Sequence, residues 1–225
     1  MEHKGILYES NPKSFAHGLN FYKLFWIFLI GSIIGFILES IWCIIVLGHL
    51  ESRKGFIYGP LTPIYGLGAV AMSIVLTRFK ESSSFIIFIV SAVVGGTFEY
   101  LGSLAQELVT GTVSWHYNTP LNLNGRTNLA FSICWGILGL LFIRYVLPVM
   151  SKLIERLPNT FGKWLTIILA VLMLFDFIIS TAAIRREVER IHLEPPSDAF
   201  DVFLDSHYDD DFLKNVYPNM ILPDE

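Results

Sequence analysis

Five long apolar runs divide the chain, and short polar segments separate them. The runs extend over Leu24–Leu47, Leu61–Thr77, Phe85–Val109, Leu129–Leu147 and Trp164–Ile184. Each approaches or exceeds the roughly 18 residues that an α-helix needs to cross the hydrocarbon core of a bilayer. The apolar stripes of soluble proteins seldom recur at this length. The pattern therefore predicts an all-α polytopic membrane protein, a bundle of about five transmembrane helices.

The second run differs from the others because helix-breaking residues interrupt its start. Pro60, Pro63, Gly66 and Gly68 all fall there. Proline removes a backbone N–H and glycine weakens a helix. We therefore expect this segment to be a short span, or one that is broken or re-entrant.

Polar segments at both ends complete the predicted organisation. Residues 1–23 form a polar N-terminal arm without the pattern of a cleavable signal peptide, so the first apolar run is expected to be a retained anchor. Residues 24–184 form the transmembrane domain, and residues 185–225 form an acidic C-terminal tail.

Composition agrees with a membrane location. Hydrophobic residues make up 53% of the chain and charged residues only 16%, a balance that is unusual for a soluble domain of this size. The net charge of −4 argues against nucleic acid as a partner. Cys43 and Cys134 fall inside the apolar runs, where they are expected to be small hydrophobic residues and not a disulfide.

The distribution of lysine and arginine predicts the orientation of the bundle. With the N-terminus in the cytoplasm, that side carries Lys4, Lys13, Lys23, Arg78, Lys80, Arg144, Lys152, Arg156 and Lys163, against Arg53, Lys54 and Arg126 in the opposite loops. Cationic loops tend to stay in the cytoplasm. Arg185, Arg186 and Arg190 follow the fifth run and would then lie outside, against the charge rule. An even number of spans would remove this conflict. We predict a plasma-membrane protein with a cytoplasmic N-terminus.

Ionisable residues inside the runs carry most of the functional information, because hydrocarbon makes each of them costly. Glu39, Glu99 and Asp176 stand out. Around Glu99 a stripe of small and polar residues recurs at helical spacing: Ala92, Gly95, Gly96, Glu99, Gly102, Ser103, Gln106 and Glu107. Such a stripe is typical of a surface that faces other helices and not lipid.

Two unusual loops are expected on the same side of the membrane as these acids. Runs one, three and five leave on one side, and each acid lies about eight to ten residues before that exit, roughly 12–15 Å along the helix. The loops Arg53–Pro60 and Trp115–Arg126 lie on this side and could roof a polar site. The candidate substrate-binding residues are Glu39, Glu99, Glu107, Arg126, Arg53, Tyr58, Trp115, Tyr117, Asn122, Asn124 and Asp176.

Each candidate also has a structural alternative. A carboxyl on a glycine-lined face can be a neutral packing element, and Arg53, Trp115 and Tyr117 can be interfacial anchors. His116 has no second His or Cys at ligand spacing, so we predict no metal site, and nothing indicates a cofactor.

These segments resemble a known family. RKGFIYGPLTPIYGLG (Arg53–Gly68), Glu99–Tyr100, WHYNTPLNLNGR (Trp115–Arg126) and Trp135–Gly136 together are similar to the CmpB-like family of bacterial membrane proteins, which are named as ABC-transporter permeases. The resemblance covers roughly Phe25–Pro148 and implies a small polytopic bacterial protein with a transport role. The family usually carries an acid at the position of His116.

Three functions stay open. The chain has no G-x-x-x-x-G-K-[ST] loop, so ATP-driven transport would need a separate ATPase subunit. The leading hypothesis is a solute-binding or transport component with a polar intramembrane cavity. The alternatives are a membrane-embedded enzyme acting on a lipid-linked or extracytoplasmic substrate, with Glu99 as acid or base, and a non-catalytic partner or sensor. A homo-oligomer is compatible with each. No nucleophile–base pair is visible, which favours transport over catalysis.

Overall fold

The computed structural model describes residues 10–222, and almost all of their regular structure is helical. The helices are α1 (Phe21–Leu47), α2 (Pro63–Leu76), α3 (Ser84–Thr110), α4 (Leu129–Leu141), α5 (Leu147–Ile154), α6 (Asn159–Ile191), α7 (Ala199–His207) and α8 (Asp210–Val216). A 3₁₀ turn, Thr77–Phe79, continues α2, and a π-helical turn, Phe142–Val146, joins α4 to α5. Two short strands, β1 (Asn122–Leu123) and β2 (Thr127–Asn128), pair in a hairpin.

Four helical stretches in the described residues are long and apolar enough to cross a membrane. They are Phe21–Leu47, Ser84–Thr110, Leu129–Ile154 and Asn159–Ile191, and each contains one of the predicted runs. A shorter apolar helix, Pro63–Phe79, lies where the sequence predicts the interrupted span. The prediction of an all-α membrane protein is confirmed.

Polar and glycine caps define where the spans begin and end. The side chains of Asn20 and Asn128 accept hydrogen bonds from the first turns of α1 and α4, at 3.0 Å from Lys23 N and 2.8 Å from Phe131 N. Gly48 closes the other end of α1 with φ of 77°, a left-handed conformation that favours glycine. The helix α1 therefore ends at Gly48, and the loop that carries the first motif follows it.

The short helix α2 is continuous, and its breakers have other roles. Pro63 occupies the first helical position, where its missing N–H would have no partner in any case. Gly66 allows close packing on α1, because a Cβ there would lie 2.2 Å from Ser32 Oγ. The helix is shorter than the predicted apolar run, because Leu61 and Thr62 belong to the preceding loop and the helix begins at Pro63.

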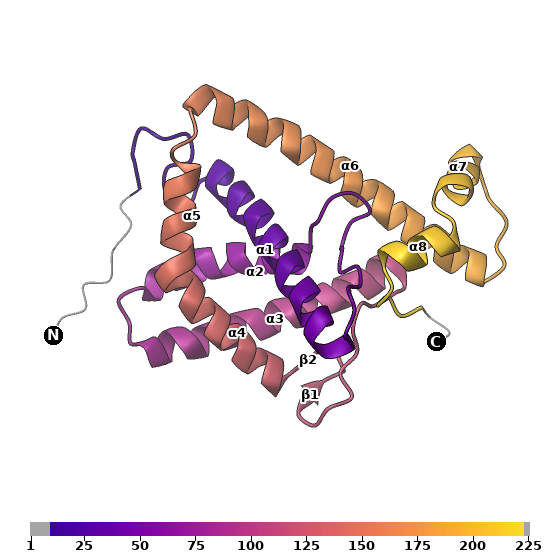
Figure 1. The fold of residues 1–225 in the computed structure, drawn as a ribbon, viewed down its shortest axis with the longest axis horizontal. Coiled ribbons are helices and arrows are strands. Elements are labelled where there is room, and N and C mark those ends of the chain that lie inside the picture. Colours follow the sequence, from indigo (N-terminus) through magenta and orange to yellow (C-terminus); the bar gives the residue numbers. More distant parts are fainter. Residues whose placement is uncertain (1–9, 223–225) are drawn as a thin grey trace.

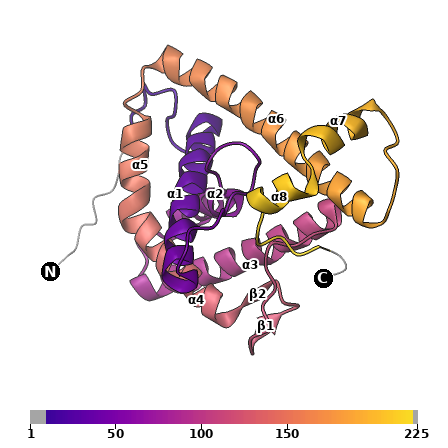
Figure 2. The ribbon, with the colours of Figure 1, turned by 45° about the vertical axis from the view of Figure 1, so that its right-hand side comes forward.

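Two closely packed helix pairs, α1 with α2 and α3 with α4, make up the bundle, and α2 joins them by packing on α3 (Figure 1). The core between them includes Ile27, Met72, Ile87 and Trp135. The long helix α6 crosses along one side and contacts α1 and α3 (Figures 1 and 2).

The fourth span bends where α4 passes into α5. Pro148 lies two residues after the π-helical turn; it has no N–H to donate, and its ring crowds the carbonyl of Arg144. The helix nevertheless continues to Ile154, beyond the predicted end at Leu147. The bend carries α5 toward the start of α6 (Figure 1).

At one end of the bundle, the N-terminal arm is docked on the α5–α6 junction. Lys23 Nζ lies 2.6 Å from Glu155 Oε1, and the two side chains are 1% and 4% exposed. Ser10 Oγ and Asn11 N also donate to the Glu155 carboxylate. Lys4, which the orientation argument counts, lies outside the described residues.

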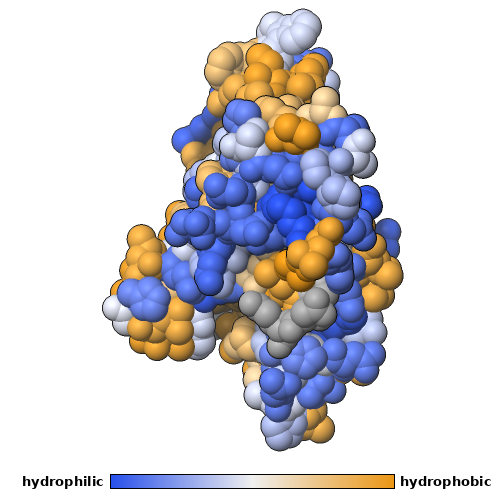
Figure 3. All heavy atoms as spheres, turned by 90° about the vertical axis from the view of Figure 1, so that its right-hand side faces the viewer, coloured by the Kyte–Doolittle hydropathy of each residue, from blue (hydrophilic) through white to orange (hydrophobic). Residues whose placement is uncertain are grey.

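The opposite end collects both motif loops and the C-terminal segment. The helix α6 continues past Ile184, and α7 and α8 pack near its end, with α8 beside the end of α3 and the loop after α1 (Figures 1 and 2). Viewed from this end, the centre of the surface is mainly hydrophilic and hydrophobic surface borders it (Figure 3). The ends of α1, α3 and α6 thus share one side of the bundle (Figures 1 and 2).

Gly95→Leu should harm assembly much more than Leu141→Ala. A Cβ at Gly95 would lie 2.3 Å from Trp135 Cβ on α4, whereas Leu141 is 47% exposed on the bundle's outer surface. Overpacking of a core contact costs about 1–3 kcal/mol or more. The measurement is the yield of monodisperse protein in detergent. Equal yields would show that α3 and α4 do not depend on this close contact.

Candidate functional site

The second motif loop folds into a β-hairpin with a tight turn. Asn124 and Gly125 both have positive φ, 52° and 71°, and Arg126 N donates to Leu123 O at 3.0 Å. This is the type I′ geometry that Asn-Gly favours. A Cβ at Gly125 would also lie 2.2 Å from the His116 ring, so the turn admits only glycine there. The Asn-Gly pair is a signal from which the hairpin could have been predicted.

The hairpin and the segment before it cover Glu99 of α3. Glu99 is 5% exposed, and both carboxylate oxygens accept hydrogen bonds: Tyr117 OH donates to Oε1 at 2.8 Å and Thr127 Oγ1 donates to Oε2 at 2.7 Å. The Tyr117 ring stacks on Phe131 of α4, with centroids 4.7 Å apart. Burial and the nearby Glu99 carboxylate raise the pKa of Tyr117, so the phenol stays protonated and donates.

Glu39 of α1 joins the same cluster through an aromatic residue of α2. Tyr65 OH donates to Glu39 Oε1 at 2.6 Å, and the Tyr65 ring lies 5.6 Å from that of Trp135 on α4. Glu39 is also close enough to Glu99 for an electrostatic interaction. Among residues 10–222, neither acid forms an ion pair. We call Glu39, Tyr65, Glu99, Tyr117 and Thr127 the acid cluster.

A small pocket lies beside the acid cluster. Its volume is about 160 Å³, and its lining residues are Ser103, Glu107, Val113, Trp115, His116, Asn124 and Arg126. Arg126 forms an ion pair with Glu107 and donates to Ser103 Oγ at 3.1 Å. Ser103 lies one helical turn after Glu99, so the pocket and the cluster share one face of α3.

Other predicted site residues organise the loops. Asp176 of α6 lies outside the acid cluster and accepts from Tyr58 N and Ser180 Oγ, each at 3.1 Å, which fixes the first motif loop on α6. Arg53 Nε contacts Cys43 Sγ at 2.7 Å, and Arg53 Nη2 contacts Glu51 Oε2 at 2.8 Å.

Three further candidate residues form hydrogen bonds within the hairpin and to its neighbours. Trp115 Nε1 donates to Arg126 O at 2.8 Å, and Asn124 Nδ2 donates to Tyr100 OH at 3.2 Å. Asn122 Nδ2 donates to Thr119 O, and its Oδ1 accepts from Gly125 N, each at 2.8 Å.

Sequence reasoning did not select Tyr65, Thr127 or Ser103 for the site. Tyr65 lies inside the first quoted motif, and a Cβ at Gly35 would lie 2.4 Å from it, so the glycine one turn before Glu39 marks where this ring packs. Thr127 carries no signal beyond its place directly after Arg126. Within the described residues, no group of three or more His, Cys, Asp or Glu could hold a metal ion.

The ordered motifs of α1 to α4 all fall within a family match that covers residues 26–181. The chain belongs to the family described as "Putative ABC-transporter type IV". The resemblance seen in the motifs is thereby confirmed, and the match extends past Pro148 through most of α6. No curated protein and no solved structure matches the chain.

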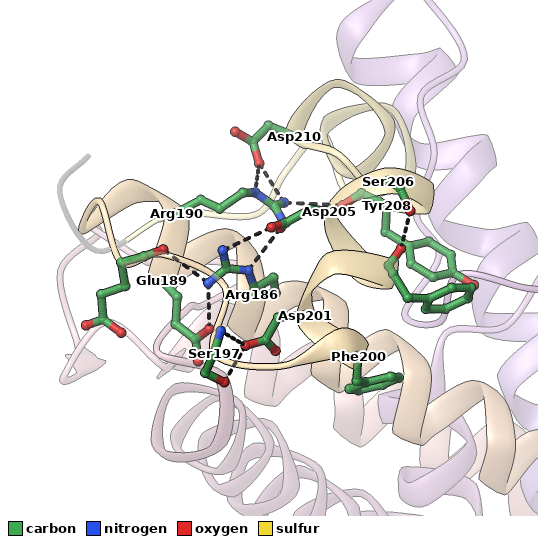
Figure 4. A network of polar contacts seen from close by, with 12 residues as sticks. Arg186, Glu189, Arg190, Ser197, Phe200, Asp201, Asp205, Ser206, Tyr208 and Asp210 are labelled. Atoms are coloured by element: carbon green, nitrogen blue, oxygen red, sulfur yellow. Dashed lines mark hydrogen bonds and ion pairs between the residues drawn. The ribbon is translucent and has the colours of Figure 1, made fainter.

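Beyond the part matched by the transporter family, two arginines of α6 bind the tail. Arg186 forms a two-pronged contact with Asp205, with Nε–Oδ1 at 2.9 Å and Nη2–Oδ2 at 3.0 Å (Figure 4). Arg190 lies 2.7 Å from the same carboxylate and 2.6 Å from Asp210. The hydrogen bonds from Arg186 and Arg190 hold the pKa of Asp205 below its usual range. We call these four residues the tail latch.

The tail in turn holds both motif loops. Val113 and Ile221 exchange two backbone hydrogen bonds, at 3.3 and 2.8 Å, and Val113 lines the pocket. Tyr208 OH lies 2.8 Å from Tyr58 OH in the first loop, and burial and this contact raise the pKa of Tyr208 to about 12. The Tyr208 phenol therefore remains neutral at physiological pH. The tail contacts the first loop at Tyr58 and the segment just before the second loop at Val113.

Asp205→Asn should release the tail at neutral pH, because Arg186 is only 3% exposed and would keep its charge without that carboxylate. Asp205 is 28% exposed and Arg186 keeps its contact with Glu189, so the loss is that of charged hydrogen bonds, about 1.5–3 kcal/mol. The measurement is the rate of proteolysis within residues 192–222. Asp211→Asn, on the exposed side of α8, is the control.

The same contact defines a pH dependence. The pKa of Asp205 is lower in the folded state than in the unfolded chain. The ionised Asp205 carboxylate therefore stabilises the fold fully above the ordinary aspartate pKa of about 3.9, and this stabilisation is lost as the pH falls through the pKa of the folded state. Cleavage of the wild-type tail should therefore stay slow down to about pH 4. Rapid cleavage of the wild type at pH 7 would contradict a stable latch.

Proposed function

We propose that this chain is the membrane-spanning, solute-binding component of a transport system, with the acid cluster and the adjacent pocket as its solute site. Membership of the transporter family supports a transport role. The observation that carries the proposal is Glu99, a buried carboxylate on a candidate membrane-spanning helix that accepts hydrogen bonds from two hydroxyl groups and forms no ion pair among residues 10–222. Polar groups held in this way inside a bundle mark solute or ion pathways.

The chemistry of the site suits a solute with a positive group or a transferable proton. Glu39 and Glu99 offer two carboxylates beside the aromatic rings of Tyr65 and Trp135, which also attract cations. In the neighbouring pocket, Arg126 and Glu107 already neutralise each other. A charged solute that enters this pocket would first separate Arg126 from Glu107 and bind one of them, and would then move on to Glu99.

A separate ATPase subunit would supply the energy, because the chain lacks a phosphate-binding loop. We place that subunit on the cytoplasmic side with the N-terminal arm, and the motif loops on the outer face of the plasma membrane. The short-loop charge bias supports this orientation.

A second candidate function is a membrane-embedded enzyme. It is favoured by one observation, that His116 lines the same pocket as Glu107 and Arg126. An imidazole and a carboxylate at a membrane surface can exchange protons with a lipid-linked substrate. Loss of turnover in His116→Gln with unchanged solute binding would favour this candidate over transport.

Glu99→Gln and Arg126→Ala should each reduce transport by about tenfold or more while leaving expression intact. Gln keeps the shape and can still accept hydrogen bonds, but it cannot ionise. A hydrogen bond to a charged group contributes about 1.5–3 kcal/mol. Comparison of metabolites and lipids in deletion and wild-type cells identifies the solute, and its uptake is then measured.

The matched control is Asn118→Ala, in the exposed part of the same loop. If Glu99 and Arg126 serve one site, the double variant should lose much less than the product of the two single losses. Full transport by Glu99→Gln would leave the acid as a packing element and refute the proposed site.

Thiol labelling should place the motif loops outside the cell. A cysteine introduced at the exposed Asn118, in a chain with Cys43 and Cys134 replaced by serine, is expected to react with a membrane-impermeant maleimide in intact cells. A cysteine at Lys13 should react only after the cells are opened. The reverse pattern would invert the proposed orientation.

A further inference from the structure

The helix α7 has an exposed aromatic face that the transmembrane bundle does not cover. Phe200 and Phe203 are 46% and 40% exposed, while Leu204 on the adjoining face is 2% exposed against α6. The rings of Phe200, Phe203 and His207 follow one another along the helix, with centroid separations of 6.3 and 4.3 Å. They form a continuous stripe, which we call the aromatic stripe.

We propose that α7 lies in the membrane interface beside the end of α6, with the aromatic stripe inserted among the lipids. The partner of α7 is then the surface of the lipid bilayer. Composition alone describes this segment only as part of an acidic tail. The proposal is independent of the transported solute, because it rests only on the membrane location of the bundle.

The depth of α7 along α6 supports this assignment. Phe200 lines a pocket of about 150 Å³ together with Ala182 and Arg185 of α6. These two residues mark the boundary between the apolar run, which ends at Ile184, and the arginines that follow it. In a transmembrane helix, this boundary lies at the headgroup level, where aromatic residues gather.

The direction of the side chains also fits. Phe200 points away from the tail latch (Figure 4). Phe175 and Ile178, which share a face of α6 with Ala182 at helical spacing, are 59% and 54% exposed. The aromatic stripe thus continues the lipid-facing surface of α6. Exposed aromatic groups of this size in a short amphipathic helix are typical of interfacial anchors.

The charges of α7 do not oppose contact with lipid. Asp205 is neutralised by Arg186 and Arg190, and Asp201 accepts two hydrogen bonds from Ser197, at 2.7 Å from its N and 2.6 Å from its Oγ. Arg185 is exposed at the same level and forms no ion pair among residues 10–222, so it is available to lipid phosphates. The Asp205 carboxylate is therefore held in the latch and the Asp201 carboxylate is held by Ser197, while the rings of the aromatic stripe stay exposed.

Spin-label accessibility tests the proposal in the full chain. The protein is reconstituted into vesicles with an excess of phosphatidylethanolamine over phosphatidylglycerol, and labels are attached at position 200, 203 or 206 after Cys43→Ser and Cys134→Ser. Ser206 is the control, because it is an exposed polar residue of the same helix, one turn after Phe203 and not part of the aromatic stripe. Labels at 200 and 203 should be several-fold more accessible to oxygen and less accessible to a nickel chelate than the label at 206.

A second measurement retains every native side chain. Vesicles that carry a lipid-tethered diazirine are irradiated with wild-type protein, and the modified peptides are mapped. We expect insertion into residues 199–207 and much less into residues 209–216 of α8. Equal nickel accessibility at 200, 203 and 206, or photolabelling confined to α1–α6, would overturn the proposal.

Discussion

The buried carboxylate of Glu99 is the group on which the arrangement of the site depends. At membrane depth no bulk water can satisfy it, so the protein must bring donors to both oxygens. Tyr117 and Thr127 are those donors, and both belong to the loop between α3 and α4. The loop therefore has to fold back onto α3, which the Asn-Gly turn makes possible. Close contact between α3 and α4 at Gly95 brings the two ends of that loop near enough for one hairpin to connect them.

The same requirement explains how the other loop is held. Asp176 and Ser180 of α6 accept hydrogen bonds from the backbone N–H groups of Tyr58 and Ile57, so these polar residues of α6 position a loop and lie outside the acid cluster. The tail contacts the first loop through Tyr58–Tyr208 and the segment just before the second loop through Val113–Ile221. Two arginines of α6 anchor the tail on this side of the bundle.

The sequence predicted the spans well because their signal is composition over length, which no tertiary contact can change. It was less informative about α2, where Pro63, Gly66 and Gly68 suggest a break. In the structure, Pro63 starts the helix, and Gly66 gives α1 room to approach. Arg186 and Arg190 oppose the predicted orientation when they are counted as loop charges. Their contacts with Asp205 and Asp210 show that they also hold the tail, which a count of charges along the chain cannot reveal.

By itself the sequence determined the membrane class, the apolar spans, and the placement of Glu39, Glu99 and Asp176 toward one side, because these follow from hydrophobic length and helical spacing. Only the tertiary structure decided which acids meet. Glu39 reaches Glu99 through Tyr65 and Trp135, whereas Asp176, at a similar depth, faces a loop on another part of the bundle. Position along a helix fixes the depth of a side chain, but the rotation and neighbours of that helix fix its partners. Those depend on contacts between residues far apart in the chain, such as Gly35 with Tyr65 and Arg186 with Asp205.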